Sequence, residues 1–307
     1  MLNRMSLVCR LIVLSIVVLT PGLSLGQTGR ATLLEWKFKE GEKFWVDTLT
    51  RIEQTERFGN NAMANLVNIR TITSYTVKKV SDANYVDLEA KIESTRYENN
   101  QTADSEKMAS LYARLQGATF KLTLSPDRTV QKLEGYNEWL LKLAAALPAG
   151  EVDRLRALVP EVDLKNAVSE GFGFLPDKEV ALNQQWKKKS ELNLAPAGTL
   201  VCSLNYTYKG IDKGKHKITI ENSKDASKFT MTPNLATPGT QSEFVLESRK
   251  GTILFNQQAG KLDQAEHAYQ TRGTILVPGS ANAAPATLLV SNRIVVTQKL
   301  TTKAPGS

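Results

Sequence analysis

The sequence offers few residues that could support metal or nucleophilic chemistry. It contains two histidines, His216 at the start of an alternating segment and His267 within "AEHAYQ". Neither has a second histidine or a cysteine at metal-ligand spacing, and the zinc-helix, calcium-loop and phosphate-loop patterns are absent from the sequence. It also lacks the G-x-S-x-G turn of many serine hydrolases. We therefore expect no catalytic residue, no metal site and no cofactor.

Carboxylates are the remaining candidates for chemistry. Asp87, Glu89 and Glu93 alternate with apolar residues and share one strand face with Lys91. Two such groups at a suitable separation could cleave a glycosidic bond, one as the acid and the other as the nucleophile or base. Alternating charge is more typical of a solvated outer face, where opposite charges pair across strands. An exported hydrolase that uses carboxylates is therefore an alternative hypothesis.

Large aromatic residues point to binding rather than catalysis. Trp45, Tyr75, Trp186 and Tyr206 lie in segments with a two-residue period. In a curved sheet they could line a concave surface that encloses an apolar ligand. Their competing role is to fill the core, which is the commoner fate of such side chains. These residues are the candidate ligand-binding positions.

The first residues have the layout of a secretory signal peptide. Arg4 and Arg10 precede an apolar run at 11–19, and small residues lead to an expected cleavage between Gly26 and Gln27. The run is short for a membrane span. We therefore expect a secreted or periplasmic protein that is not an integral membrane protein after cleavage.

Cleavage there changes the charge and the thiol content. The leader carries two arginines and no acidic residue, so the formal net charge of +8 becomes +6. A modest positive charge spread over strands of mixed sign does not indicate a nucleic-acid partner. Cys202 is left without a second cysteine, and its place between Leu200 and Leu204 predicts a buried thiol.

After the leader a two-residue period dominates and predicts a mainly antiparallel β protein. "SPDR" places Pro126 at the second position of a turn, where its fixed φ fits. The composition of "NNAMAN" predicts a loop at 60–65. The expected strands of the first half cover residues 33–39, 43–53, 67–77, 85–94, 119–124 and 129–135.

A short helical insert interrupts the strands. "NEWLLKLAAAL" starts at Asn137 and ends before Pro148, and further helical patterns continue to about residue 170. The two-residue period returns at Trp186, and "VPGSANAAPAT" at 277–287 is expected to be a loop. The expected strands of the second half cover residues 200–210, 216–222, 228–232, 243–248, 252–256 and 287–300. The predicted organisation is a signal peptide (1–26), a first β unit (27–136), a helical insert and linker (137–174), a second β unit (175–300) and a flexible tail (301–307).

The two β units resemble each other. "KEGEKFWVDTL" from Lys39 can be laid over part of "LPDKEVALNQQWKKKSEL", which matches Trp45 to Trp186, and Tyr75 can then be matched to Tyr206. The match predicts an internal duplication of half-barrel or curved-sheet units that close into one barrel-like or clam-like body. Chance similarity is the alternative, because alternating strands share composition.

Several short motifs resemble a known family. "GEKFWVD", "LPDKEVALNQQW" and "GTILFNQQAGKL", together with the exported start, are similar to a bacterial family of exported β-rich proteins catalogued as a domain of unknown function. The family pattern has a glycine and then an acidic residue before the middle tryptophan, whereas this chain has Asn183, Gln184 and Gln185. The resemblance implies a fold and a compartment, and no catalytic residue.

The leading functional hypothesis is a non-catalytic exported protein that binds an apolar ligand or an envelope protein. The expected curved sheet and the lack of catalytic motifs motivate it. The alternatives are the carboxylate hydrolase and a structural or assembly module.

Overall fold

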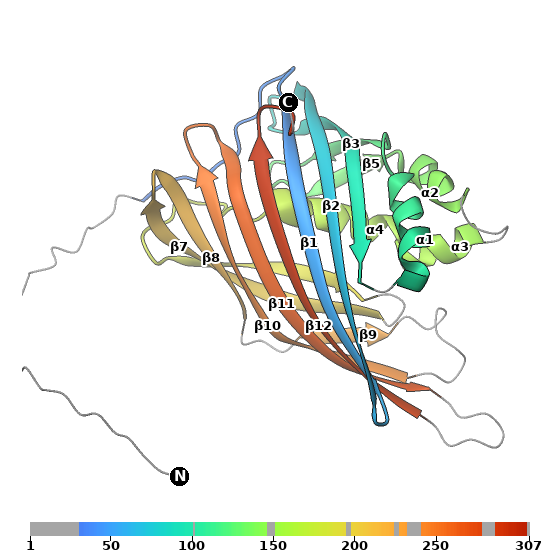
Figure 1. The fold of residues 1–307 in the computed structure, drawn as a ribbon. Helices are drawn as coiled ribbons and strands as arrows, with labels where there is room; N and C mark the ends of the chain where they lie inside the picture. Colours follow the sequence, from blue (N-terminus) through green and yellow to red (C-terminus); the bar gives the residue numbers. More distant parts are fainter. Residues whose placement is uncertain are drawn as a thin grey trace, which may run out of the picture.

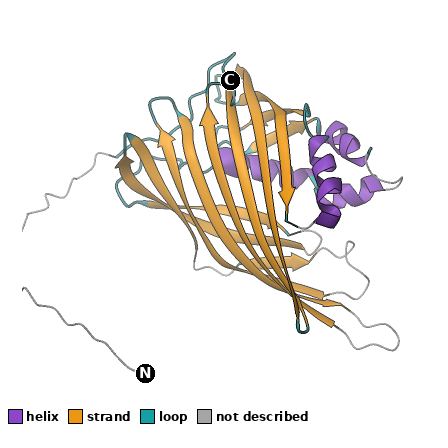
Figure 2. Cartoon of the chain, viewed as in Figure 1, coloured by secondary structure: helices purple, strands orange, loops and turns teal. Residues whose placement is uncertain are grey.

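The computed structural model of the protein describes residues 31–100, 102–145, 151–194, 198–223, 227–231, 241–277 and 286–305. The predicted signal peptide and most of the predicted loop at 277–287 lie outside these residues. Strands dominate, as predicted, and the helices lie behind the sheet and along one edge of it (Figures 1 and 2). In chain order the elements are β1 (Lys43–Phe58), β2 (Asn61–Val80), β3 (Val86–Asn99), α1 (Thr102–Ala113), β4 (Thr119–Leu124), β5 (Val130–Glu134), α2 (Tyr136–Ala144), α3 (Glu151–Leu158), α4 (Glu161–Phe172), β6 (Gln185–Asn193), β7 (Gly198–Asp212), β8 (Lys215–Asn222), β9 (Lys228–Met231), β10 (Gln241–Asn256), β11 (Lys261–Val277) and β12 (Ala286–Thr301).

The strands form one 12-stranded sheet in the order β5-β4-β3-β2-β1-β12-β11-β10-β8-β7-β6, with β9 beside β7. Each neighbouring pair in this order is antiparallel. The sheet therefore consists of a first meander (β1–β5) and a second meander (β6–β12), joined where β12 pairs with β1. The long strands at this junction run side by side across the molecule (Figure 1).

The predicted antiparallel fold with a curved sheet is confirmed, and of the two expected shapes the barrel-like one is excluded because the sheet is not closed into a barrel. Within the described residues its edges are β5 and β6, and helix α4 lies between them. The backbone N–H of Val130 on β5 donates to Ser169 Oγ of α4 at 2.9 Å, and Ser190 Oγ on β6 donates to Glu170 Oε2 of α4 at 2.7 Å. The predicted helical insert thus occupies the position where strand pairing would have closed the sheet.

We define the inner face as the side of the sheet that packs against α4. One hydrophobic core covers this face and includes Phe44 and Val77 from the first meander and Leu204 and Phe255 from the second. Phe172 at the end of α4 belongs to the same core. Because both meanders contribute to a single core, they form one folded body.

Residues 33–39 are not a strand, contrary to the prediction. Leu34 and Trp36 are buried, so the two-residue period correctly predicted which side chains are buried. The segment is extended, but it is held by an isolated bridge between Thr32 and Val180 and by the N–H of Lys37, which donates to Gly260 O at 3.0 Å. Alternation reports burial on one side and does not by itself report a partner strand.

The predicted loop at 60–65 is also wrong, because β1 and β2 form one long hairpin that turns at Gly59, with a φ of 56°. Residues 61–65 pair with 54–58, and this cross-strand pairing overrides a loop-like composition. Helix α1 was not predicted, since its large apolar residues occur only in its last turns. It packs on β3, where Tyr97 and Tyr112 stack with ring centroids 5.1 Å apart.

Other expectations are confirmed. β2 and β3 are antiparallel neighbours, and β4 and β5 form the hairpin around Pro126. The helical insert is present as α2, α3 and α4. Cys202 is buried, and burial raises the pKa of its thiol. The domain boundaries and the internal duplication stay predictions.

Candidate functional site

The two faces of the sheet differ in charge where the long strands β1, β12 and β11 meet. Strand register assigns alternate residues to each face, with Phe44 and Ala265 on the inner side. The outer positions here include the charged residues Asp47, Arg51, Glu53, Glu266, Arg293 and Lys299. The inner positions contain no Asp, Glu, Lys or Arg; they are Phe44, Val46, Thr48, Thr50, Ile52, Ala265, His267, Tyr269, Thr271, Ile294, Val296, Gln298 and Leu300.

This uncharged inner face is not completely covered. Thr48, Thr50, Ile294 and Val296 are half-buried, whereas Phe44 at the upper end of β1 is fully buried. A half-buried sheet face without formal charge is unusual for a surface that meets only water. The inner face of the long strands therefore has the properties of a binding surface for apolar groups.

A cavity of 230 Å³ lies between α4 and this face. Apolar groups from α4 and from β10, β11 and β12 supply much of its wall, and a few polar side chains complete it. Its lining consists of Ala167, Glu170, Gly171, Phe174, Glu191, Leu192, Tyr206, Arg249, Ile253, Leu262, Ala265, His267, Tyr269, Val296 and Gln298. An apolar cavity of about 150 Å³ is sufficient to hold benzene, so this volume suits a small apolar group or part of a larger ligand.

Arg249 is the buried cation of the cavity wall, with 4% of its surface exposed. Its Nη2 donates to Glu170 Oε1, and its Nη1 donates to Ser190 Oγ at 2.6 Å. The guanidinium also lies over the ring of Tyr269, 5.6 Å from the centroid. Burial is the strongest single influence and would lower the pKa of Arg249, but Glu170, with smaller contributions from Tyr206 and Cys202, raises the pKa overall.

Two buried nitrogens of the cavity wall have no hydrogen-bond partner among the described residues. They are Nε of Arg249 and Nδ1 of His267. Burial, followed by the nearby Arg249 charge, lowers the pKa of His267 to about 4, so its imidazole is neutral at pH 7. Burial also raises the pKa of Tyr269 to about 12 and that of Tyr206 above its usual range. Since buried polar groups are normally paired, these nitrogens mark a place where a ligand could bind.

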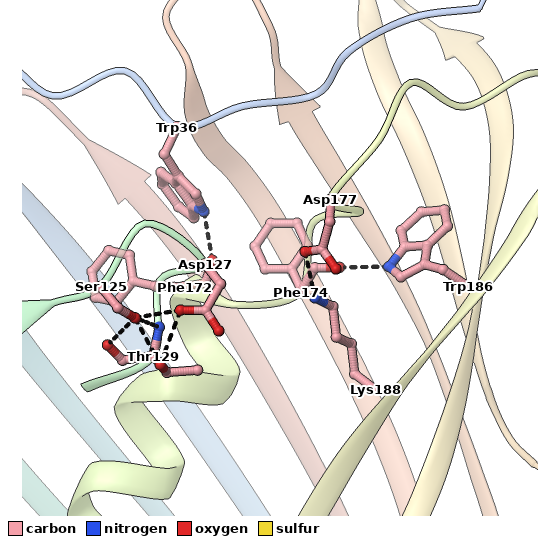
Figure 3. Close-up of polar contacts among 9 residues, drawn as sticks. All are labelled: Trp36, Ser125, Asp127, Thr129, Phe172, Phe174, Asp177, Trp186 and Lys188. Atoms are coloured by element: carbon pink, nitrogen blue, oxygen red, sulfur yellow. Dashed lines mark hydrogen bonds and ion pairs between the residues drawn. The ribbon is translucent and has the colours of Figure 1, made fainter. Parts of the chain in front are cut away.

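Two tryptophans fix the segment that forms one wall of the cavity (Figure 3). Trp36 Nε1 donates to Phe172 O at 2.7 Å, and Trp186 Nε1 donates to Phe174 O at 2.9 Å. Figure 3 shows the two indoles approaching this short segment from different directions, Trp36 from above and Trp186 from the right. The end of α4 is thereby tied to both, which positions Phe174 against the cavity.

The predicted binding residues are only partly brought together. Tyr206 lines the cavity and stacks on Trp186, with centroids 5.7 Å apart. Tyr75 lies on the inner face and stacks on Phe44 in the core, and burial raises its pKa to about 12. Trp45 lies on the outer face, where Lys43 Nζ sits 4.9 Å from the ring centroid.

Sequence reasoning missed the polar end of the cavity. In β10 a bulge falls between Leu246 and Ser248. It reverses which alternate residues face inward, so Arg249 lies on the inner face together with Phe244 and Leu246. The alternation therefore breaks just before the arginine, and a strict two-residue count from Phe244 places Arg249 outside. Only this interruption in "EFVLESRKG" could have indicated a special position.

The residues considered for catalysis are not gathered at the cavity. Glu89 pairs with Lys78 at 3.1 Å, and Glu93 with Lys91 at 2.9 Å, on the outer face of the first meander. His216 Nδ1 lies 2.8 Å from the hydroxyl of Tyr208, away from His267. In the described parts of the chain, no group of three or more His, Cys, Asp or Glu side chains could hold a metal ion. Likewise, no helix described here is both long and apolar enough to cross a membrane.

A second hollow, of 440 Å³, lies on the other side of α4. Several polar side chains in its wall pair with each other or with neighbouring residues. Asn166 Nδ2 donates to Glu191 Oε2 at 2.7 Å, and Lys188 Nζ lies 3.1 Å from Asp177 Oδ1, a contact visible in Figure 3. The smaller cavity, with its unpaired buried nitrogens, is therefore the better candidate site.

Comparison with solved structures gives distant likenesses. The chain is similar to a structure described as showing lipid–protein interactions in lipovitellin, with a TM-score of 0.41 and 8% identity over 88% of this chain and 26% of that one. It is also similar to DynF from the dynemicin pathway of Micromonospora chersina, with a TM-score of 0.21 and 8% identity over 88% of this chain and 86% of that one. A third similar structure is the outer membrane protein OprG from Pseudomonas aeruginosa, with a TM-score of 0.21 and 7% identity over 88% and 99% of the two chains.

The chain therefore spans about a quarter of the length of the lipovitellin chain that it matches. A comparison with curated proteins gives no match. The model of a family of unknown function (DUF6263) matches residues 73–261, which is more than half of the chain and includes Glu170, Ser190 and Arg249 but not His267. The predicted resemblance to such a family is thus confirmed, and the chain belongs to the family of unknown function DUF6263.

Proposed function

We propose that this protein is an exported, non-catalytic binding protein that holds an apolar ligand between α4 and the inner face of the sheet. The observation that carries the proposal is the contrast between the faces of the long strands. The outer face carries charged residues, whereas the inner face carries none from Phe44 to Ile52 on β1 and is only half-buried at Thr50. Apolar surface of this kind is stabilised by an apolar partner.

The cavity extends this surface. Val296 belongs both to the cavity lining and to the uncharged inner face, so the cavity opens toward the long strands. A ligand anchored beside α4 would continue over Val296 and Thr50, which are adjacent in the sheet. The layout of the first 26 residues supports export, and the cell envelope is the compartment we assign.

The experiment is a binding titration with the apolar dye N-phenylnaphthylamine, whose fluorescence rises in an apolar environment. The purified protein is compared with Val296→Trp, which fills the space over the inner face, and with Val295→Trp. Val295 is the neighbouring residue of β12 and faces outward, opposite Arg51. The larger side chain costs little there, so it is a matched control.

We expect saturable dye binding to the wild type and to Val295→Trp, and at least tenfold weaker binding to Val296→Trp. Circular dichroism and thermal melting establish that both variants are folded. Equal binding by all three proteins, or no binding by the wild type, would overturn the proposal.

A further inference from the structure

We infer that the polar end of the cavity selects an uncharged amphiphile whose head carries a carbonyl oxygen, such as an acyl ester or an acyl amide, over the corresponding fatty carboxylate. This inference rests on the proposed function. It names the class of head group and the residues that recognise it, Arg249 and His267.

The charges around the cavity oppose an anionic ligand. Arg249 is already paired with Glu170, and Glu191 also lines the cavity. His267 is neutral at pH 7, because burial depresses its pKa to about 4. A bound carboxylate would therefore be an uncompensated negative charge beside a site that is already balanced, and burying such a charge is costly.

The unpaired nitrogens define what the head group must supply. Nε of Arg249 carries a hydrogen and can only donate, so it requires an acceptor oxygen. A carbonyl oxygen meets this requirement without a formal charge. Nδ1 of His267 can accept or donate according to the tautomer, so a hydroxyl or an amide N–H next to the carbonyl suits it.

The backbone of β10 lies close to the histidine. Gly251 lies directly opposite His267 across β10 and β11. A Cβ at Gly251 would sit 3.0 Å from His267 Nδ1 and 2.7 Å from Glu266 O, which is too close for an ordinary side chain. Only a glycine therefore fits at residue 251, where the backbone packs closely beside Nδ1 of His267. Arg249, two residues earlier on the same strand and face, brings the second nitrogen to the same side.

The rest of the ligand has a defined path. From β10 the inner face continues across β11, β12 and β1 to β2, through Val296 and Thr50 to Ile69. Four strand spacings correspond to roughly 19 Å, which a long acyl chain would cover. No formal charge lies on this path between Arg249 and Ile69. The head would thus bind at Arg249 and the chain would lie across the long strands.

The test is displacement of bound N-phenylnaphthylamine by monoolein, by oleate and by hexadecane at pH 7.5. Monoolein and oleate share one acyl chain and differ in the head, and hexadecane has no head. The variant is the double replacement Arg249→Met with Glu170→Gln, which removes the donor without leaving a buried charge. The matched control is Lys261→Met with Glu42→Gln, which removes a different buried ion pair whose residues do not line the cavity.

We expect the wild type and the control to bind monoolein at least tenfold more tightly than oleate or hexadecane, since a hydrogen bond from a charged donor contributes on this scale. In the Arg249→Met/Glu170→Gln variant the advantage of monoolein over hexadecane, measured against the dye affinity of the same variant, should fall about tenfold. If the dye binds but monoolein has no advantage, or keeps its advantage in the variant, the head-group inference is wrong. If the dye does not bind the wild type at all, the proposed function fails with it.

Discussion

Two cations are buried among the residues that the structure describes, and their surroundings differ. Lys261, at the start of β11, is 4% exposed; its Nζ donates to Lys37 O and to Glu42 Oε2, the latter at 3.1 Å. It also lies over the rings of Phe38 and Phe44, with centroids at 5.1 Å and 5.8 Å. Arg249 is equally buried and paired with Glu170, but it retains an unpaired Nε in the wall of a cavity.

The difference separates a structural role for Lys261 from the binding role that we propose for Arg249. The contacts of Lys261 connect the N-terminal extended segment to the β10–β11 hairpin, and its ammonium has oxygen and aromatic partners on several sides. The contacts of Arg249 position the guanidinium without using all of its donors. A buried, incompletely paired donor costs stability, and binding sites are where such costs are offset by a ligand.

The largest predicted effect comes from removing the acid of each pair. Glu170→Gln leaves Arg249 buried and charged, because an arginine stays protonated, and should destabilise the protein by about 3 kcal/mol. Glu42→Gln should cost less, about 1 to 2 kcal/mol, because a buried lysine can release its proton. Urea unfolding at pH 7.5 measures both changes.

The pH dependence of these two variants sharpens the comparison. Burial lowers the pKa of Lys261, and Glu42 partly offsets this effect, so the pKa falls further when Glu42 is replaced. Above that folded-state pKa and below the unfolded value, the unfolded chain binds more protons, so stability rises with pH. The deficit of Glu42→Gln should therefore shrink between pH 8 and pH 10, whereas that of Glu170→Gln should not. A parallel change in both variants would contradict the distinction.

His267 should give the cavity end of the sheet an acid-sensitive stability. Its folded-state pKa is about 4, below the ordinary value of 6.5, so the unfolded state binds more protons between these values. About 2 kcal/mol of stability should be lost as the pH falls from 8 to 5. In His267→Gln the unfolding free energy should change much less over this range, while His216→Gln, measured in the same urea titrations, should retain most of the loss.

The two indoles that fix the end of α4 should have smaller effects. Trp36→Phe and Trp186→Phe each remove one hydrogen bond to a backbone carbonyl, worth about 1 kcal/mol. Trp36 is the more deeply buried of the two, so Trp36→Phe should lower the unfolding free energy more than Trp186→Phe. Thermal melts rank the two variants, and a larger cost at Trp186 would show that the β6 side fixes the segment.

The smallest effect is expected on the outer face. Glu53 pairs with Arg51 at 3.0 Å and with Arg293 at 3.3 Å, but all three side chains are well exposed. Glu53→Gln should change the unfolding free energy by no more than about 0.5 kcal/mol. If Glu53→Gln lowered the unfolding free energy as much as Glu170→Gln, the ion pairs of the exposed outer face would stabilise the protein as much as the buried pair does, and this contrast would be lost.

The two-residue period predicted the β class, the inner residues of β7 and the burial of Cys202, because burial on one face requires alternation. It could not predict the long β1–β2 hairpin, which depends on pairing between residues 61–65 and 54–58. Nor could it predict that Arg249 faces inward, because the bulge after Leu246 reverses which alternate residues lie on the inner face. The cavity itself depends on where α4 lies between β5 and β6, a tertiary relation that no local pattern contains.

The predicted duplication gains a specific form from the fold. The stacked pair Trp186 and Tyr206 on β6 and β7 has a counterpart in Phe44 and Tyr75 on β1 and β2, with interplanar angles of 14° in both. Trp45, which the sequence comparison matches to Trp186, lies on the other face of β1 from Phe44. The internal duplication stays a prediction.

The most direct test of ligand binding on the inner face is native mass spectrometry of the protein after incubation with monoolein. We expect one monoolein per chain on the wild type and on Val295→Trp, released on unfolding, and no such adduct on Val296→Trp. A bare wild-type chain, or the same adduct on Val296→Trp, would contradict it.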